Sequence, residues 1–135
     1  MPGTDTDTTD SFAPAPDAIR GTVEAYLAAL RSGSSAAIVA LYADDATLED
    51  PAGTAPKVGR DAIAQFYSAL DGSPQKAELL TLRVSGASAA FHFRVTSPVG
   101  DHEYEVEPID VMTFDEQARI TSMRAYWSSE NLRQL

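Results

Sequence analysis

The feature that most constrains the fold is a change in the spacing of apolar residues at Pro74. Before Pro74, apolar side chains recur every three or four positions, as on one face of a helix; after it they alternate with polar ones, as along a strand. Helices followed by hairpin-linked strands are typical of an α+β domain. The sequence therefore predicts a cone-shaped domain, in which three helices pack on a curved, mainly antiparallel sheet and enclose an apolar pocket.

Three helices are predicted in the first half of the chain. The first begins at Asp17, whose side chain can cap a helix N-terminus, and ends at Gly33. The second covers 35–42, and the third ends at Gly72. The residues expected on their inward faces are Ile19, Val23, Tyr26, Leu30, Ile38, Leu41, Tyr42, Ile63, Phe66, Tyr67 and Leu70.

The remaining segments are predicted to be extended or looped. Residues 47–50 form a short extended segment, because Pro51 disfavours the helical region for the residue before it, and 51–59 form a loop. Alternation with a period of two predicts four further strands, at 76–84, 88–97, 102–114 and 118–127. The turns between these strands are expected at 85–87, 98–101 and 115–117.

A chain of 135 residues is long enough for one domain with one hydrophobic core. Residues 1–16 contain aspartate, threonine and proline but no basic residue, a composition typical of a disordered leader. We therefore expect an acidic leader over 1–16 and a single folded domain over 17–135.

Charge and cysteine content exclude several function classes. Twenty Asp and Glu residues against ten Lys and Arg give a net charge of −10, which repels a phosphate backbone, so nucleic acid is not an expected partner. No apolar run approaches the roughly twenty residues that span a bilayer, and no secretion signal is apparent, so no membrane association is expected. The absence of cysteine excludes disulfides and thiolate chemistry, and is compatible with the expected cytoplasmic location.

Asp110 is the first candidate for chemistry, because alternation along 102–114 places it in an apolar row between Pro108 and Met112. A carboxylate held there would lose its hydration, so its pKa should rise and the neutral acid could donate a hydrogen bond. Two structural explanations compete with this one. Asp110 could cap a neighbouring main-chain amide, or an irregularity at Pro108 could turn it outward.

Tyr26 and Asp50 are two further candidates. Tyr26 lies on the inward face of its helix, where a buried phenol normally finds a hydrogen-bond partner, although a core tyrosine is the commoner explanation. Asp50 ends an extended segment, a place where reactive groups are often presented, but alone it is one Asp in an acidic chain.

The sequence predicts no metal site and no phosphate-binding loop. Asp44, Asp45 and Glu49 are interpreted as solvated charges or helix-end caps rather than as ligands of a cation. His92 and His102 lack the paired spacing of a zinc motif. No glycine-rich phosphate cradle follows a strand, and no GxSxG elbow is present.

Four segments carry a resemblance to a known family. They are AYLAAL (25–30), IVALYADDATLEDP (38–51), PID (108–110) and SMRA (122–125). Together they resemble bacterial Δ5-3-ketosteroid isomerases over nearly everything from residue 17 onward, and the order and spacing of Tyr26, Asp50 and Asp110 agree. The wider superfamily, which resembles nuclear transport factor 2 and scytalone dehydratase, uses the same cone fold for dehydration, epoxide hydrolysis, cyclisation and binding.

The resemblance implies a reaction, the isomerisation of a 3-oxo-Δ5 steroid to its conjugated Δ4 isomer through a dienolate. Asp50 would be the base that moves a proton from C4 to C6. Tyr26 and a neutral Asp110 would donate hydrogen bonds to the C3 oxygen, and an acid kept neutral in this way is an established feature of the family. The resemblance further implies that no metal or organic cofactor is required and that the chain forms a homodimer.

Other residues would support these three. Tyr42 and Tyr67 match tyrosines that hydrogen-bond to the catalytic one, and Trp127 matches an aromatic residue near the base. The candidates for the pocket wall, for which ordinary core packing is the alternative, are Phe66, Phe91, Phe93, Met112, Met123 and Trp127.

Two other functions stay open from the sequence. The first is a noncatalytic protein that binds steroids or similar hydrophobic molecules in the same pocket. The second is another enzyme of this fold, such as an epoxide hydrolase or a polyketide cyclase. Because all three candidate residues are retained, the sequence favours the isomerase.

Overall fold

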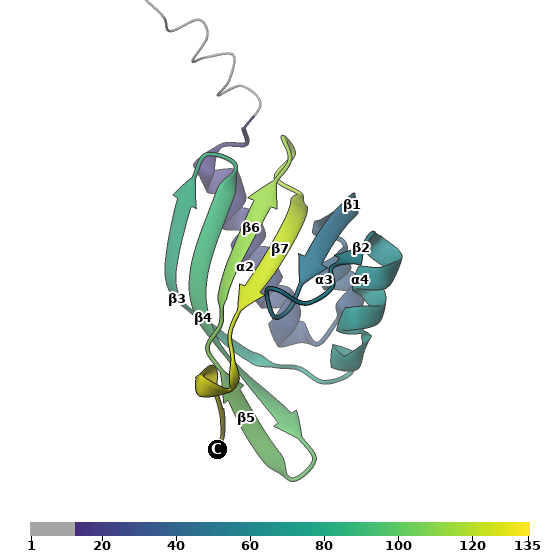
Figure 1. Ribbon diagram of the computed structural model, residues 1–135, viewed down its shortest axis with the longest axis vertical. Helices are drawn as coiled ribbons and strands as arrows, with labels where there is room; N and C mark the ends of the chain where they lie inside the picture. Colours follow the sequence, from purple (N-terminus) through teal and green to yellow (C-terminus); the bar gives the residue numbers. More distant parts are fainter. Residues whose placement is uncertain (1–12) are drawn as a thin grey trace, which may run out of the picture.

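The computed structural model describes residues 13–135, and its α+β architecture confirms the predicted fold class (Figure 1). The helices are α2 (Pro16–Ser32), α3 (Ser35–Val39) and α4 (Arg60–Tyr67), with 3-10 turns at Ser68–Leu70 and Ser129–Asn131. The strands are β1 (Tyr42–Glu49), β2 (Lys57–Val58), β3 (Lys76–Ser85), β4 (Ser88–Val99), β5 (His102–Val106), β6 (Ile109–Phe114), β7 (Ile120–Tyr126) and β8 (Leu132–Gln134).

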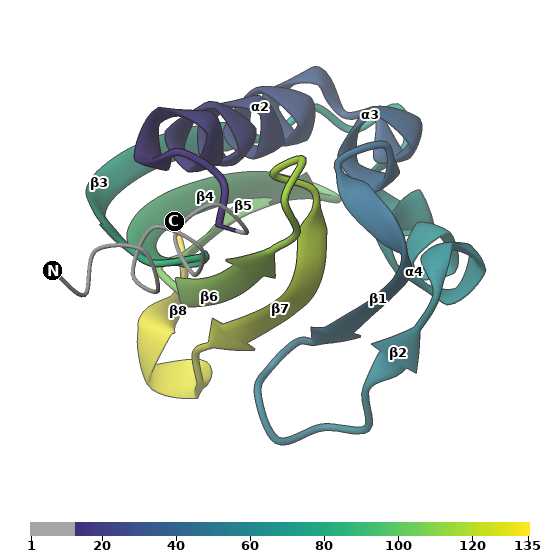
Figure 2. The ribbon, with the colours of Figure 1, turned by 90° about the horizontal axis from the view of Figure 1, so that it is seen from above.

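All strands belong to one curved sheet, in the order β2-β1-β7-β6-β4-β5-β8, with β3 also paired to β4. Every pairing is antiparallel except that of β1 with β7, which is parallel. Viewed from above, α2 lies over one face of the sheet, and α3 and α4 lie beside its β1 edge (Figure 2). The helices and the curved sheet thus enclose a common interior.

The first helix matches the prediction apart from its first residue. It begins at Pro16 with Ala15 as its N-cap, so Asp17 lies in the first turn rather than at the cap. Proline is favoured at this position because its missing N–H would have no helical partner. The helix ends as expected at Gly33, whose φ of 67° is left-handed and whose N–H bonds to the carbonyl of Leu30.

The predicted helix over 35–42 is wrong at its C-terminal end. Helix α3 ends at Val39, and Tyr42 is instead the first residue of β1. Tyr42 pairs with Ile120 of β7, whose N–H donates to the carbonyl of Leu41 at 2.9 Å. Strand pairing between β1 and β7 therefore overrides the helix-like spacing of the apolar residues at 38–42. The predicted loop 51–59 also contains the short strand β2, which pairs with β1.

The predicted strand 102–114 is interrupted at residues 107 and 108. Pro108 has no N–H to donate to the sheet, and the N–H of Glu107 bonds to Asn131 after β7 instead of to β4. The register nevertheless continues across the break, because β4 pairs Val95 with Val106 and His92 with Ile109. Asp110 is therefore buried on the inner face, which excludes the outward-turned alternative.

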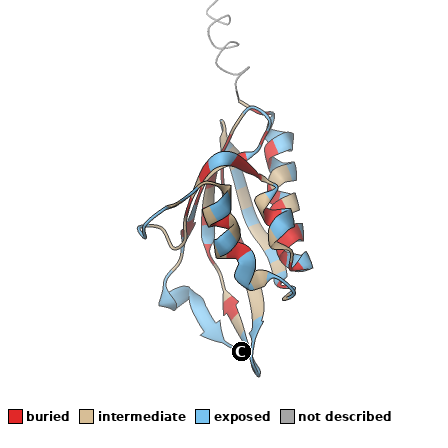
Figure 3. Cartoon of the chain, turned by 90° about the vertical axis from the view of Figure 1, so that its right-hand side faces the viewer, coloured by how far each residue is buried: buried red, intermediate tan, exposed pale blue. Residues whose placement is uncertain are grey.

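The core lies between the helices and the inner face of the sheet. Figure 3 shows the buried positions where the helices meet the strands. From α2 the core takes Ile19, Val23 and Leu27, and from the sheet it takes large side chains such as Phe91 and Met123. Burial of these apolar side chains, at about 1.5–3 kcal/mol each, holds the two layers together.

Residues 1–12 lie outside the described range, and so does most of the leader predicted for 1–16. No helix in the described part of the chain is both long and apolar enough to cross a membrane.

The turn after α2 provides a test of the packing between α2 and the segment that enters β3. A Cβ atom on Gly33 would lie 2.7 Å from the nitrogen of Pro74, whereas one on Gly72, which also has a left-handed φ, would meet nothing within 4 Å. We expect Gly72→Ala to cost about 1 kcal/mol through backbone strain alone. Gly33→Ala should cost about 2 kcal/mol or more, because strain and overlap add. Urea denaturation measures both values, and equal losses would contradict this account of the turn.

Candidate active site

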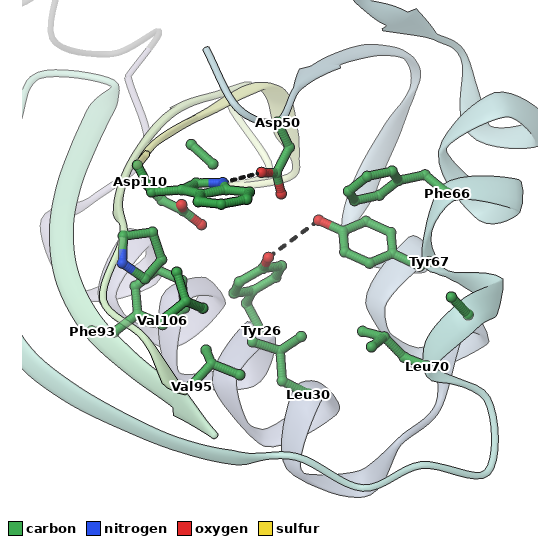
Figure 4. A pocket seen from close by; sticks show the side chains of 14 residues that line it. Tyr26, Leu30, Asp50, Phe66, Tyr67, Leu70, Phe93, Val95, Val106 and Asp110 are labelled. Atoms are coloured by element: carbon green, nitrogen blue, oxygen red, sulfur yellow. Dashed lines mark hydrogen bonds between the residues drawn. The ribbon is translucent and has the colours of Figure 1, made fainter. Parts of the chain in front are cut away.

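A pocket of about 330 Å³ opens between α2, α4 and the inner face of the sheet (Figure 4). Nine lining residues are apolar, and they are Leu30, Phe66, Ala69, Leu70, Phe93, Val95, Val106, Pro108 and Ala125. Five carry a polar group, and they are Tyr26, Asp50, Tyr67, Asp110 and Trp127. Figure 4 shows that the polar ends of Tyr26, Asp50 and Asp110 point into the same part of the pocket. The structure therefore brings together the three residues that the sequence singled out.

Asp50 is held at the point where β1 ends. One neighbour, Glu49, turns to the other face of the sheet and pairs with Arg124 of β7 at 3.1 Å. On the other side, the N–H of Ala52 donates to the carbonyl of Ala125 at 2.7 Å. The indole N–H of Trp127 donates to Asp50 Oδ1 at 2.6 Å. This bond fixes one carboxyl oxygen, and among residues 13–135 the other oxygen accepts no hydrogen bond.

The surroundings of Asp50 act on its acidity in opposite directions. Burial raises the pKa of Asp50 because it penalises the charged form, while the Trp127 hydrogen bond and the charge of Lys57 lower it. The pKa of Asp50 is raised on balance. A base that acts on a weakly acidic carbon benefits from such a shift, provided that it is still ionised at the working pH.

Asp110 is 1% exposed, and neither of its carboxyl oxygens has a hydrogen-bond partner among the described residues. The alternative that it caps a main-chain amide is therefore excluded for residues 13–135. Burial, and next the negative charge of Asp50, raise the pKa of Asp110 well above its usual range. Burial therefore favours the neutral form of Asp110, which has an O–H group to donate.

The hydroxyl groups of Tyr26, Tyr67 and Tyr42 form a chain. Tyr42 and Tyr67 share a hydrogen bond of 2.8 Å, and Tyr67 and Tyr26 share one of 3.2 Å. Burial raises the pKa of each phenol well above its usual range, so all three are neutral. If Tyr42 donates to Tyr67 and Tyr67 to Tyr26, the proton of Tyr26 is free for a ligand. The two supporting tyrosines implied by the resemblance thus lie where they can orient Tyr26.

The pocket-wall candidates divide into two groups. Phe66, Phe93 and Trp127 line the pocket. The other three candidates, Phe91, Met112 and Met123, are at most 1% exposed and belong to the core rather than to the lining. These three side chains do point toward the interior, as the strand alternation predicts. Other side chains separate them from the pocket. The Phe91 ring, for example, packs edge-on against Tyr26 at 6.3 Å between centroids.

Sequence reasoning did not assign several lining residues to the pocket. These are Leu30, Ala69, Leu70, Val95, Val106, Pro108 and Ala125. For Val106 and Pro108 a signal was available, because both share the strand face of Asp110. The same holds for Leu30, which is one helical turn from Tyr26 on the inward face of α2.

The acidic and histidine residues that were considered as metal ligands do not line the pocket. Asp44 and Asp45 are exposed, and Asp44 pairs with Arg60. His92 contacts Glu107 at 3.0 Å and His102 contacts Gln134 at 2.9 Å. Within residues 13–135, no three His, Asp or Glu side chains are grouped so that they could hold a metal ion.

Together these groups can perform one kind of chemistry. An ionisable carboxylate with one fixed oxygen lies beside two neutral O–H donors in an apolar pocket. Such a site can remove a proton from carbon next to a carbonyl while the donors stabilise the negative charge that develops on oxygen.

Comparison with known proteins identifies the family of the chain. The model of the SnoaL-like domain family matches residues 23–123. A steroid Delta-isomerase of Nocardioides simplex is 56% identical over 110 residues, which cover 82% of this chain and 89% of that protein. A solved structure of the epoxide hydrolase/cyclase-like enzyme SalBIII, which is connected with pyran ring formation in salinomycin, superimposes with a TM-score of 0.78. It is 23% identical and covers 84% of this chain and 93% of its own, so the likeness extends to the fold alone. This chain belongs to the SnoaL-like domain family and, within it, to the steroid Delta-isomerases.

Proposed function

We propose that this protein is a steroid Δ-isomerase, which converts a 3-oxo-Δ5 steroid into its conjugated Δ4 isomer. The observation that carries the proposal is the buried carboxyl group of Asp110, which has no partner among the described residues and points into an apolar pocket that also contains Asp50. A buried polar group without a partner costs free energy. A ligand oxygen that accepts its proton would remove that cost.

The distribution of polar groups in the pocket orients the substrate. Because Tyr26, Asp50 and Asp110 lie together and the rest of the lining is largely apolar, the pocket suits a large apolar molecule with one oxygen at one end. The C3 oxygen of the steroid would accept hydrogen bonds from Tyr26 and Asp110. Its other rings would contact side chains such as Leu30 and Val95.

The reaction then needs one proton to move between two carbons. Asp50 accepts a proton from C4, and the electron pair left behind forms the dienolate, whose negative charge is on the C3 oxygen. The same carboxyl group returns the proton to C6, and the double bond ends in conjugation with the carbonyl. No electron enters or leaves, and Asp50 finishes as the carboxylate with which it began.

A noncatalytic steroid binder and a cyclase or epoxide hydrolase of the same fold are the alternatives. A binder would not need a carboxylate whose environment raises its pKa, beside a second carboxyl group that is kept neutral. The steroid Delta-isomerase relative is 56% identical, whereas the epoxide hydrolase/cyclase-like neighbour is 23% identical. Both observations favour the isomerase.

The proposed enzyme is also a homodimer. Ile109 and Tyr126 are paired across β6 and β7 and are each 46% exposed on the outer face of the sheet. Two adjacent large apolar side chains on an open sheet face favour contact with a second copy of the chain.

Light scattering should give twice the chain mass for the wild type and a smaller mass for Ile109→Lys. Val99→Lys, at an exposed site near the β4–β5 turn, is the control; an unaffected Ile109→Lys variant would contradict this interface.

Replacement of Asp50 tests the proposed base. Asp50→Asn keeps the size of the side chain but cannot accept the proton, so kcat/KM should fall at least about 10²-fold. The increase in ultraviolet absorbance as the conjugated enone forms measures the rate. The control is Asp45→Asn, an exposed position on the same strand, which should leave the rate unchanged.

Ligand binding by the same variant separates catalysis from recognition. The wild-type carboxylate repels the charge of a phenolic steroid bound at Tyr26 and Asp110, and Asn removes that repulsion. Asp50→Asn should therefore bind such a steroid at least as tightly as the wild type in a calorimetric titration. Much weaker binding by the folded variant would assign Asp50 to ligand recognition, and unchanged turnover would assign the base to another residue.

Replacement of Asp110 tests the proposed donor. Asp110→Leu removes the O–H group and should lower kcat about 10²- to 10³-fold, as expected for the loss of one donor to a developing oxyanion. Asp110→Asn still has an N–H group to donate and should lose less. Because Leu removes a buried polar group that has no partner among residues 13–135, Asp110→Leu should also be at least as stable as the wild type to urea. A marked loss of stability would show that Asp110 has a structural partner, and an unchanged kcat would contradict its role as donor.

A further inference from the structure

The two residues of β2 face the opposite way from what their polarity predicts. Lys57 pairs with Leu48 of β1, and directly paired residues of antiparallel strands lie on the same face of the sheet. Leu48 is fully buried, so Lys57 is on the inner face, while Val58 is turned outward and is 64% exposed. An edge strand that only completed the core would have the apolar residue inside and the charged residue outside.

The Lys57 side chain lies against Phe66, a residue of the pocket. Its ammonium nitrogen lies 5.0 Å from the centroid of the Phe66 ring, which is within the range of a cation–π interaction. Phe66 itself lines the pocket, and Lys57 is half-buried. The positive charge therefore lies against a side chain that lines the pocket, instead of moving freely in solvent.

Asp50 lies on the same face, two residues beyond the partner of Lys57. Side chains alternate along β1, so Ala46, Leu48 and Asp50 point inward in turn. Lys57 and Asp50 therefore lie on the same face, with Asp50 just past the end of β1, and this separation is one that a long side chain can span.

We propose that Lys57 is a positioning residue for the reaction: its ammonium group, held on the Phe66 ring, faces Asp50 and keeps that carboxyl group in the ionised form that can accept a proton. This inference rests on the proposed role of Asp50 as the base. It explains how a carboxylate can be largely withdrawn from water and still be charged when the substrate arrives, because a nearby positive charge offsets part of the desolvation cost.

Within residues 13–135, Lys57 is the one cation whose charge acts appreciably on Asp50. From α2 and α4 the pocket receives the phenols of Tyr26 and Tyr67, and from β6 the carboxyl group of Asp110, and burial favours the neutral form of each. The indole of Trp127, which follows β7, donates a hydrogen bond to Asp50 and is uncharged. The Phe66 ring of α4, against which Lys57 lies, is also uncharged. The ion pair of Glu49 with Arg124 is on the opposite face of the sheet. The charge of Lys57 accordingly lowers the pKa of Asp50, against the effect of burial.

A purely structural explanation of Lys57 is also testable. Inward-pointing charges on edge strands prevent sheets from joining edge to edge. In that case a substitution would change aggregation or stability but would leave the titration of Asp50 unchanged. The dependence of the reaction rate on pH therefore distinguishes the two explanations.

The experiment compares Lys57→Met, Lys57→Arg and Lys76→Met with the wild type. Met keeps most of the apolar stem on Phe66 but removes the charge, and Arg keeps the charge. Lys76, the other lysine, is exposed and pairs with Glu103, so it serves as the control. The kcat/KM for isomerisation of a 3-oxo-Δ5 steroid is measured as a function of pH, because its acidic limb reports the pKa of the base in the free enzyme.

We expect Lys57→Met to move this acidic limb to higher pH by about 0.5 to 1 unit, less than a fully buried pair would give because Lys57 is partly solvated. The activity loss should therefore be confined to low pH and disappear on the alkaline side. Lys57→Arg should restore the wild-type profile, Lys76→Met should match it, and 1 M salt should move the wild type toward Lys57→Met. A uniform loss of rate at every pH, or an unmoved limb in a folded Lys57→Met protein, would overturn the proposal.

A second readout separates failure of this inference from failure of the proposed function. The carboxyl ¹³C resonance of Asp50, assigned through Asp50→Asn, can be titrated in protein without substrate. If the wild type shows no turnover but the Asp50 titration still moves upward in Lys57→Met, the isomerase function is wrong and the electrostatic pairing stands. If turnover is present and the titration does not move, the role of Lys57 is wrong and the isomerase stands.

Discussion

The site depends on a carboxyl group, that of Asp110, which is withdrawn from water and has no hydrogen-bond partner within residues 13–135. Asp110 is buried among apolar side chains of β4, β6 and β7, and folding must bear the cost of that burial. The cost is smallest when the group is neutral, so the surrounding core determines its protonation state. The apolar packing that holds the helices to the sheet thus also prepares a hydrogen-bond donor in the pocket wall.

Two carboxyl groups in one pocket differ because their surroundings differ. Asp50 lies just past a strand end, accepts a hydrogen bond from Trp127 and is influenced by a positive charge. Asp110 is instead paired within β6 between β4 and β7, and its carboxyl group accepts no hydrogen bond from residues 13–135. Negative charge on Asp50 further disfavours ionisation of Asp110. This difference in surroundings is the physical basis for the proposal that Asp50 transfers the proton and Asp110 donates a hydrogen bond.

Much of this arrangement was predictable from local patterns. Alternation along 102–114 put Asp110 inside correctly, because a period of two leaves each residue only two possible faces and its neighbours were apolar. Patterns that depend on long-range pairing were not predictable. Tyr42 begins a strand because β7 lies beside it, and Lys57 points inward because Leu48 is its partner. Local alternation likewise could not separate core residues such as Phe91 from pocket residues such as Phe93, since both face the interior.

A crystal structure with a steroid whose A ring is a phenol would show how a ligand is oriented at the three polar groups. We expect the phenolic oxygen to lie within about 2.5–2.8 Å of both the Tyr26 hydroxyl and the Asp110 carboxyl group, as expected for charge-assisted O–H···O bonds. The Asp50 carboxyl group should lie over the same ring, near the carbons that exchange the proton. A steroid bound in the reverse direction, or a phenolic oxygen in contact with Asp50 instead, would contradict the account.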